Sequence, residues 1–212
     1  MKKAQKGLNA GLLGSMCWPD IQDKERLQVC ADFVNYLFHL DDLTDEMDAI
    51  SAGGVREAVI DVLDDPEKWT KKISRREAHA ISVLTLEQVS RTPHIVSDSN
   101  AADSMWLRIC RTATPLVQRR FRDTLEEFFV AIMDEAIDRK KKVIRGVQDY
   151  IIRRRANGAV RPCFVLIEYA NGFELPESVW HHPIIRDLQD WADDLVSWAN
   201  GGFYLSVCAC LF

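Results

Sequence analysis

The longest regular pattern in the chain is an apolar stripe that follows Pro115 and ends at the basic run Arg139 to Lys142. Its large side chains recur every three or four residues: Leu116, Phe121, Leu125, Phe128, Phe129, Ile132, Met133, Ala136 and Ile137. At about 3.6 residues per turn, this spacing places them on one side of an α-helix. A helix with so wide an apolar face is stable only when other elements cover that face, so this segment constrains the fold most.

Helical spacing also dominates the rest of the chain, and no alternation of β-branched residues rivals it. Glycine (10) and proline (7) are scarce among the 212 residues, which disfavours a fold of many short strands and turns. We expect chain breaks at Ser51–Gly54 and at Asn171–Gly172. The predicted helices span Ile21 to about Asp48, Val55–Leu63, about Arg75–Val89, a segment with Met105 to Cys110 after N-cap candidates Ser97–Asn100, Gln148–Arg155, Pro162–Tyr169 and Pro183–Asn200. The sequence predicts one all-α domain.

Charge and cysteine content exclude several functional classes. A net charge of −5 argues against a nucleic-acid partner, so any phosphate must be bound locally. The six cysteines form no CxxC pair, which favours reduced thiols over a zinc site. The apolar last ten residues, 203–212, are too short for a membrane span, which needs about 20 residues. No secretion signal is evident, and we expect a cytoplasmic protein with no membrane span.

An acidic cluster ends the first long apolar segment. Five of the eight residues from Asp41 to Asp48 are acidic. On a continuing helix, Asp41, Asp45 and Asp48 would share one face within about 60° of rotation, directly after the apolar Leu37. Carboxylates grouped in this way suit Mg²⁺, which binds a few carboxylates together with water and phosphate oxygens. The alternative is an acidic helix end that lies entirely in water.

Three stretches together resemble the class I terpene synthases, and fungal sesquiterpene cyclases in particular. Asp41-Asp42-Leu43-Thr44-Asp45, preceded by Asn35 to Leu40, is similar to the aspartate-rich motif of that family. The segment Tyr150 to Gly158 is similar to the one that carries the family's diphosphate-sensing arginine. Further residues follow in the family's order: Glu168, Pro176, His182-Pro183 and Trp191 to Asn200. The resemblance extends from about Gly11 to Asn200.

This resemblance implies an incomplete class I terpenoid synthase helical bundle and a set of functional residues. Asp41 would bind Mg²⁺ directly, with Asp45 as a weaker or bridging ligand and Asp42 in support. Arg154 would be the diphosphate sensor, Asn157 the linker and Gly158 the effector, and catalysis would depend on Asp41, Asp45 and Arg154. Without the family, Arg153 to Arg155 could equally be a solvated basic helix end. We expect Phe33, Leu37 and Trp198 to pack in the core rather than to line a pocket.

The family's second metal motif, Asn-Asp-x-x-Ser-x-x-x-Glu, is represented here by its first residue. Asn200 lies 46 residues after Arg154, which matches the family, whereas Asp193 lies only 39 after it. The residues after Asn200 resemble nothing in the family. We therefore divide the chain into a partial terpene synthase domain, 1–200, and an apolar tail, 201–212, that a splice or gene-model change could explain.

The expected ligands and activity follow from this resemblance. The complete family site holds three Mg²⁺ ions, and we expect fewer here. The substrate would be farnesyl diphosphate or a similar prenyl diphosphate, and the protein a monomer or weak homodimer. The chain as written would be inactive as a cyclase, since two ligands of one motif are missing. The alternatives are a cyclase with weak activity and a non-catalytic helical interaction module.

Overall fold

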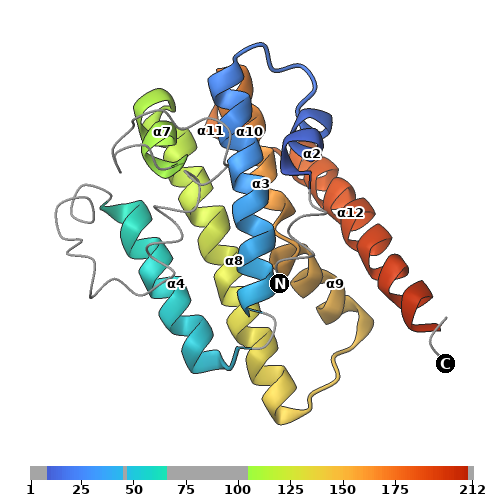
Figure 1. The fold of residues 1–212 in the computed structure, drawn as a ribbon. Helices are drawn as coiled ribbons and strands as arrows, with labels where there is room; N and C mark the ends of the chain where they lie inside the picture. Colours follow the sequence, from blue (N-terminus) through green and yellow to red (C-terminus); the bar gives the residue numbers. More distant parts are fainter. Residues whose placement is uncertain (1–8, 45–46, 66–104, 210–212) are drawn as a thin grey trace.

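The structure is a computed structural model that describes residues 9–44, 47–65 and 105–209. Every regular element within these ranges is an α-helix, which confirms the predicted all-α fold (Figure 1). The helices are α2 (Ala10–Cys17), α3 (Lys24–Thr44), α4 (Ala49–Asp64), α7 (Met105–Thr112), α8 (Pro115–Lys141), α9 (Val147–Asn157), α10 (Val160–Asn171), α11 (Glu177–Trp180) and α12 (Pro183–Ala209). The helix predicted for about Arg75–Val89 and the N-cap candidates Ser97–Asn100 lie outside the described residues.

Helix α8 forms the centre of the bundle, as its apolar stripe predicts. It begins where the side chain of Thr114 accepts a hydrogen bond from the backbone N–H of Val117, with Pro115 in the first turn. Helices α4, α7, α9 and α10 pack against it. The ring of Phe121 is fully buried between Phe33 of α3 and Trp106 of α7, with centroids 5.2 and 5.7 Å away. The core is therefore built around α8.

The predicted break at Ser51–Gly54 is wrong. Helix α3 already ends at Thr44, and the side chain of Asp48 accepts a hydrogen bond from the backbone N–H of Ser51 at 2.8 Å, so that α4 starts at Ala49. Gly53 and Gly54 therefore lie inside α4. A Cβ on Gly53 would lie 3.5 Å from the Met133 side chain of α8, which is an ordinary van der Waals distance, so the packing here does not require glycine. Burial of α4 against α8 outweighs a glycine cost of about 1 kcal/mol per residue.

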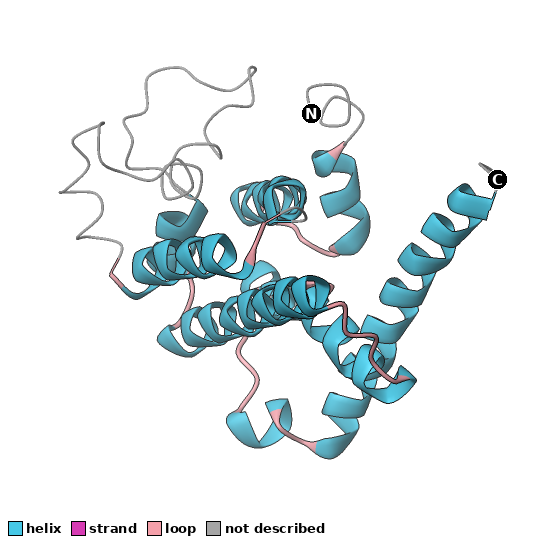
Figure 2. Cartoon of the chain, turned by 90° about the horizontal axis from the view of Figure 1, so that it is seen from below, coloured by secondary structure: helices cyan, strands magenta, loops and turns pink. Residues whose placement is uncertain are grey.

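The last helix is longer than predicted. Asn171–Gly172 does end α10, with Gly172 in the left-handed conformation at φ 69°. Helix α12, however, continues without interruption past Asn200 to Ala209. In Figures 1 and 2 its C-terminal part diverges from α3 and α8, and among the described residues no helix is long and apolar enough to cross a membrane.

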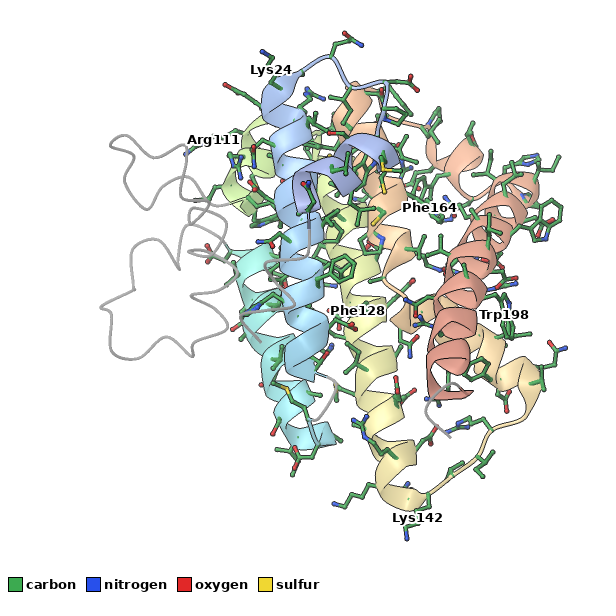
Figure 3. All side chains as sticks on the ribbon, turned by 45° about the vertical axis from the view of Figure 1, so that its right-hand side comes forward. Lys24, Arg111, Phe128, Lys142, Phe164 and Trp198 are labelled. Atoms are coloured by element: carbon green, nitrogen blue, oxygen red, sulfur yellow. The ribbon has the colours of Figure 1, made fainter. Side chains whose placement is uncertain are left out.

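An exposed apolar stripe runs along α12. Its members, half to three-quarters exposed, are Ile184, Leu188, Trp191, Leu195 and Trp198. The expectation that Trp198 packs in the core is therefore wrong, because it lies on the outer side of α12 (Figure 3). Phe33 is fully buried as expected, and Leu37 is partly buried against the core.

A buried ion pair fastens α8 to α10. Nη1 of Arg120 lies 2.7 and 3.0 Å from the two carboxylate oxygens of Glu168, and both side chains are almost inaccessible. Glu168 also accepts a hydrogen bond from the backbone N–H of Leu175, and Arg120 donates to the Leu175 carbonyl and to Glu177. The guanidinium lies 4.5 Å from the centre of the Trp180 ring. These contacts fix the segment between α10 and α11.

The described cysteines are free thiols, as expected: Cys17, Cys30, Cys110 and Cys163. Burial raises the pKa of Cys30 and of Cys163 to about 12. Neither group ionises near neutral pH, so both act as small apolar residues of the interior.

Candidate functional site

The three consecutive arginines of α9 have different partners. Arg153 lies 3.4 and 3.5 Å from carboxylate oxygens of Asp134 and Asp138 on α8. Arg155 binds both oxygens of Asp194 on α12 at 2.7 and 2.6 Å, and it also binds Asp190. Arg153 and Arg155 are therefore paired with carboxylates.

Among the described residues, the side chain of Arg154 donates hydrogen bonds to two side-chain amides. Its Nη1 donates to Oδ1 of Asn157 at 2.9 Å, and its Nη2 donates to Oδ1 of Asn200 on α12 at 3.1 Å. Within the part of the chain that the structure describes, no carboxylate lies within ion-pair distance of this guanidinium. Neutral amides orient it without cancelling its charge. Arg154 thus retains its full positive charge for an anionic ligand.

The structure brings the predicted sensor, linker and second-motif residue together. Asn157 is held in turn, since its Nδ2 donates to Oε2 of Glu135 on α8 at 2.7 Å. The cluster Arg154–Asn157–Asn200 therefore joins α8, α9 and α12. Arg154 and Asn200 are 46 residues apart in the sequence and are joined by a direct hydrogen bond.

Gly158 lies next to this cluster, where α9 ends and α10 begins. Its backbone N–H donates to the Arg154 carbonyl at 3.0 Å, and its φ of −72° is one that any residue adopts. A Cβ here would lie 3.0 Å from that carbonyl oxygen and 3.1 Å from Oγ of Ser197 on α12. Close approach, not backbone conformation, therefore requires glycine at this position. The left-handed conformation falls on the following residue, Ala159, at φ 52°.

The acidic motif is described only in part. Asp41 is exposed near the C-terminal end of α3, the side chain of Asp42 is outside the description, and Asp45 lies outside the described residues. The prediction that Asp48 shares a helix face with Asp41 and Asp45 is wrong, because α3 ends at Thr44 and Asp48 caps α4. Figure 1 shows the C-terminal end of α3, helix α9 and the second half of α12 at the same end of the bundle.

No three acidic, histidine or cysteine side chains in residues 9–44, 47–65 and 105–209 form a cluster that could hold a metal ion.

Two polar residues of α12 that the sequence did not assign to the site are buried beside it. Asp193 is fully buried, and Ser197 donates a hydrogen bond to its Oδ1 at 3.2 Å. Nε of Arg161, in the first turn of α10, lies 3.7 Å from Oδ2 of Asp193. Burial raises the pKa of Asp193 from an ordinary value near 3.8 to about 6, opposed by the Ser197 hydrogen bond and by the charge of Arg161. Their spacing of four residues imitates half of the family's metal motif, but their side chains face the protein interior.

The raised pKa of Asp193 predicts a pH-dependent stability. A carboxyl group that binds its proton more tightly in the folded state destabilises the protein as pH rises from about 4 to 6, and no further above that range. The hydrogen bond from Arg155 holds the pKa of the neighbouring Asp194 below its ordinary value, so that carboxyl group is already ionised across most of this range. We expect Asp193→Asn to remove this pH dependence. The difference in unfolding free energy between the variant and the parent should therefore change in favour of the variant by about 1–3 kcal/mol as pH rises from 4 to 6. Urea unfolding at several pH values measures this, and a constant difference between the two proteins would contradict it.

Comparison with known proteins agrees with this geometry. Residues 32–203 match the family model described as terpene synthase family 2, C-terminal metal binding. The chain is 37% identical over 206 residues to sesquiterpene synthase 1 of Postia placenta, which covers 97% of this chain and 54% of that protein. It is 36% identical over 206 residues to sesquiterpene synthase Agr1 of Cyclocybe aegerita, with 97% and 53% covered. The chain spans about half the length of these curated relatives.

A solved structure shows the same fold. Germacradien-4-ol synthase from Streptomyces citricolor superposes with a TM-score of 0.67 at 23% identity, covering 92% of this chain and 58% of that one. At this identity the likeness shows the fold alone. The chain belongs to terpene synthase family 2, and its relatives include fungal sesquiterpene synthases.

Proposed function

We propose that this chain binds the diphosphate group of a prenyl diphosphate, with farnesyl diphosphate as the expected substrate, in the presence of Mg²⁺. The observation that carries the proposal is Arg154, whose guanidinium is oriented by Asn157 and Asn200 and is not neutralised by any described carboxylate. A cation held in this way by neutral groups is suited to an anion that arrives from solution.

The residue types at this end of the bundle fit Mg²⁺. The ion prefers carboxylate and amide oxygens together with water and phosphate oxygens. Asp41, Asp42 and Asp45 would hold it from the side of α3, and Asn200 from the side of α12. When bound, Mg²⁺ would neutralise the charge that develops on the departing diphosphate.

The remaining roles belong to residues of the chain itself. Arg154 would bind the diphosphate oxygens and stabilise their charge as the carbon–oxygen bond breaks. Gly158, at the effector position, would present its carbonyl toward that bond.

We propose further that these 212 residues do not complete a cyclisation. Counted from Asn200, the motif requires Ser at the fifth position and Glu at the ninth, where this chain has Tyr204 and Cys208. Neither is a good Mg²⁺ ligand. A cyclic hydrocarbon formed from farnesyl diphosphate and Mg²⁺ by the purified chain, and lost in Asp41→Asn, would contradict this part of the proposal.

Binding of inorganic pyrophosphate with Mg²⁺, measured by titration calorimetry, tests the first part. Because hydrogen bonds between charged groups contribute about 1.5–3 kcal/mol, we expect Arg154→Gln to weaken binding roughly 10- to 100-fold. Arg153→Gln is the matched control, since that arginine faces two carboxylates of α8, and it should change the affinity less than about threefold. Equal affinities for the parent and Arg154→Gln would contradict the proposal.

A further inference from the structure

The side of α12 that faces the bundle is polar. Of the α12 side chains described, only Asp193 and Ser197 are buried, whereas Ile185 is half-buried and the other large apolar side chains of this helix are exposed. Burying polar groups is unfavourable unless they are hydrogen-bonded. Apart from Ile185, the contacts that hold α12 in this orientation are therefore largely polar.

Two arginines on either side of the turn between α9 and α10 supply part of these contacts. Arg155, near the end of α9, binds Asp190 and Asp194, and Arg161, near the start of α10, binds Asp190 and approaches Asp193. Both draw the acidic residues of α12 toward the turn that contains Gly158. Arg155 binds both carboxylate oxygens of Asp194 at 2.7 and 2.6 Å, and Arg161 lies 2.9 Å from Asp190, so these pairs draw α12 toward the end of α9 and the start of α10. Apart from Asp193, their side chains are 21–31% exposed, so each pair contributes little free energy.

Asp193 and Ser197 add a buried contact between α12 and the turn that contains Gly158. Oγ of Ser197 occupies the space beside Gly158, 3.1 Å from the position of a Cβ there, and its hydroxyl hydrogen is directed to Asp193 at 3.2 Å. Asp193, Ser197 and Asn200 are spaced by four and three residues, which places them on one face of α12. The contact between Ser197 and Gly158 therefore sets how closely Asn200 approaches Arg154, one helical turn farther along.

We infer that Asp193 and Ser197 are positioning residues for the diphosphate site. Asp193 fixes the Ser197 hydroxyl, Ser197 packs against Gly158, and this contact holds both the α9–α10 turn and the Arg154–Asn200 hydrogen bond in register. The inference rests on the proposed role of Arg154 in diphosphate binding and assigns that site two residues that do not touch the ligand.

Four variants test the inference with two measurements. Ser197→Ala removes the hydroxyl, Asp193→Leu removes its acceptor, and Asp193→Asn retains an acceptor oxygen of the same size. Asp187→Leu is the control on an exposed position of α12. The measurements are Mg²⁺–pyrophosphate affinity by calorimetry, and the NMR resonances of the Gly158 backbone amide and the Asn200 side-chain amide.

We expect Ser197→Ala and Asp193→Leu to weaken pyrophosphate binding about 5- to 20-fold and to shift both resonances. Asp193→Asn should bind within about twofold of the parent, because the acceptor is restored, and Asp187→Leu should equal the parent in both measurements. Affinities of Ser197→Ala and Asp193→Leu within about twofold of the parent would overturn the inference, as would an Asp193→Asn affinity as low as that of Asp193→Leu. If Asp193→Leu does not fold, Ser197→Ala alone decides.

Failure of the proposed function is distinguishable from failure of this inference. If the parent does not bind pyrophosphate, the proposed function is wrong, and the resonances then decide the positioning role. Gly158 and Asn200 resonances that do not change in Ser197→Ala would overturn the positioning role. Resonances that shift in Ser197→Ala but match those of the parent in Asp193→Asn would support it.

Discussion

Arg120→Leu should lower the free energy of unfolding by about 3–5 kcal/mol. The substitution leaves the carboxylate of Glu168 buried with its charge no longer balanced, and it removes the donors to the Leu175 carbonyl and Glu177. A buried charge without its partner is among the most destabilising changes a single substitution can make. Urea denaturation at pH 7, followed by circular dichroism, measures the loss.

Arg119→Leu is the matched control for this substitution. Its guanidinium is largely exposed, and its ion pair within the described chain is with the exposed Glu177, so the change should be below about 1 kcal/mol. A loss for Arg120→Leu as small as that of Arg119→Leu would show that Glu168 takes up a proton or finds another partner.

Phe121→Ala should cost about 3–5 kcal/mol of unfolding free energy. The ring is fully buried and lies in contact with Phe33 and Trp106, so its removal leaves a cavity at the centre of the bundle that neighbouring helices fill only partly. Equilibrium unfolding in urea again gives the value. Ile144→Ala is the control, at a residue that is 97% exposed, and it should be nearly neutral. If Phe121→Ala costs as little as Ile144→Ala, the core has collapsed around the missing ring and the prediction is wrong.

The main features of the fold could be predicted because they depend on local spacing. The apolar period after Pro115 is long enough to identify α8 with its bounds, and Gly172 ends α10 where the sequence places the stop. The region from Thr44 to Gly54 could not be predicted in the same way. There a helix cap by Asp48 and the packing of α4 on α8 outweigh the usual effect of a glycine pair, and the packing is long-range in sequence.

The candidate site likewise contains residues that could be predicted from the sequence and residues that could not. Arg154, Asn157 and Asn200 could be named from the family's order and spacing, and they do meet in the structure. The roles of Asp193 and Ser197 depend on which side of α12 faces the bundle. An apolar stripe ordinarily predicts the buried side of a helix, and on α12 that rule gives the wrong side.

The exposed stripe of α12 also affects how the folding of this protein can be assayed. Dyes such as ANS bind accessible apolar surface and are commonly used to detect states that have lost their packing. Here Trp191, Leu195 and Trp198 offer such a surface on the fully folded chain. Dye fluorescence would therefore report the native state as well, and near-UV circular dichroism of the buried aromatic cluster is the better indicator of ordered packing.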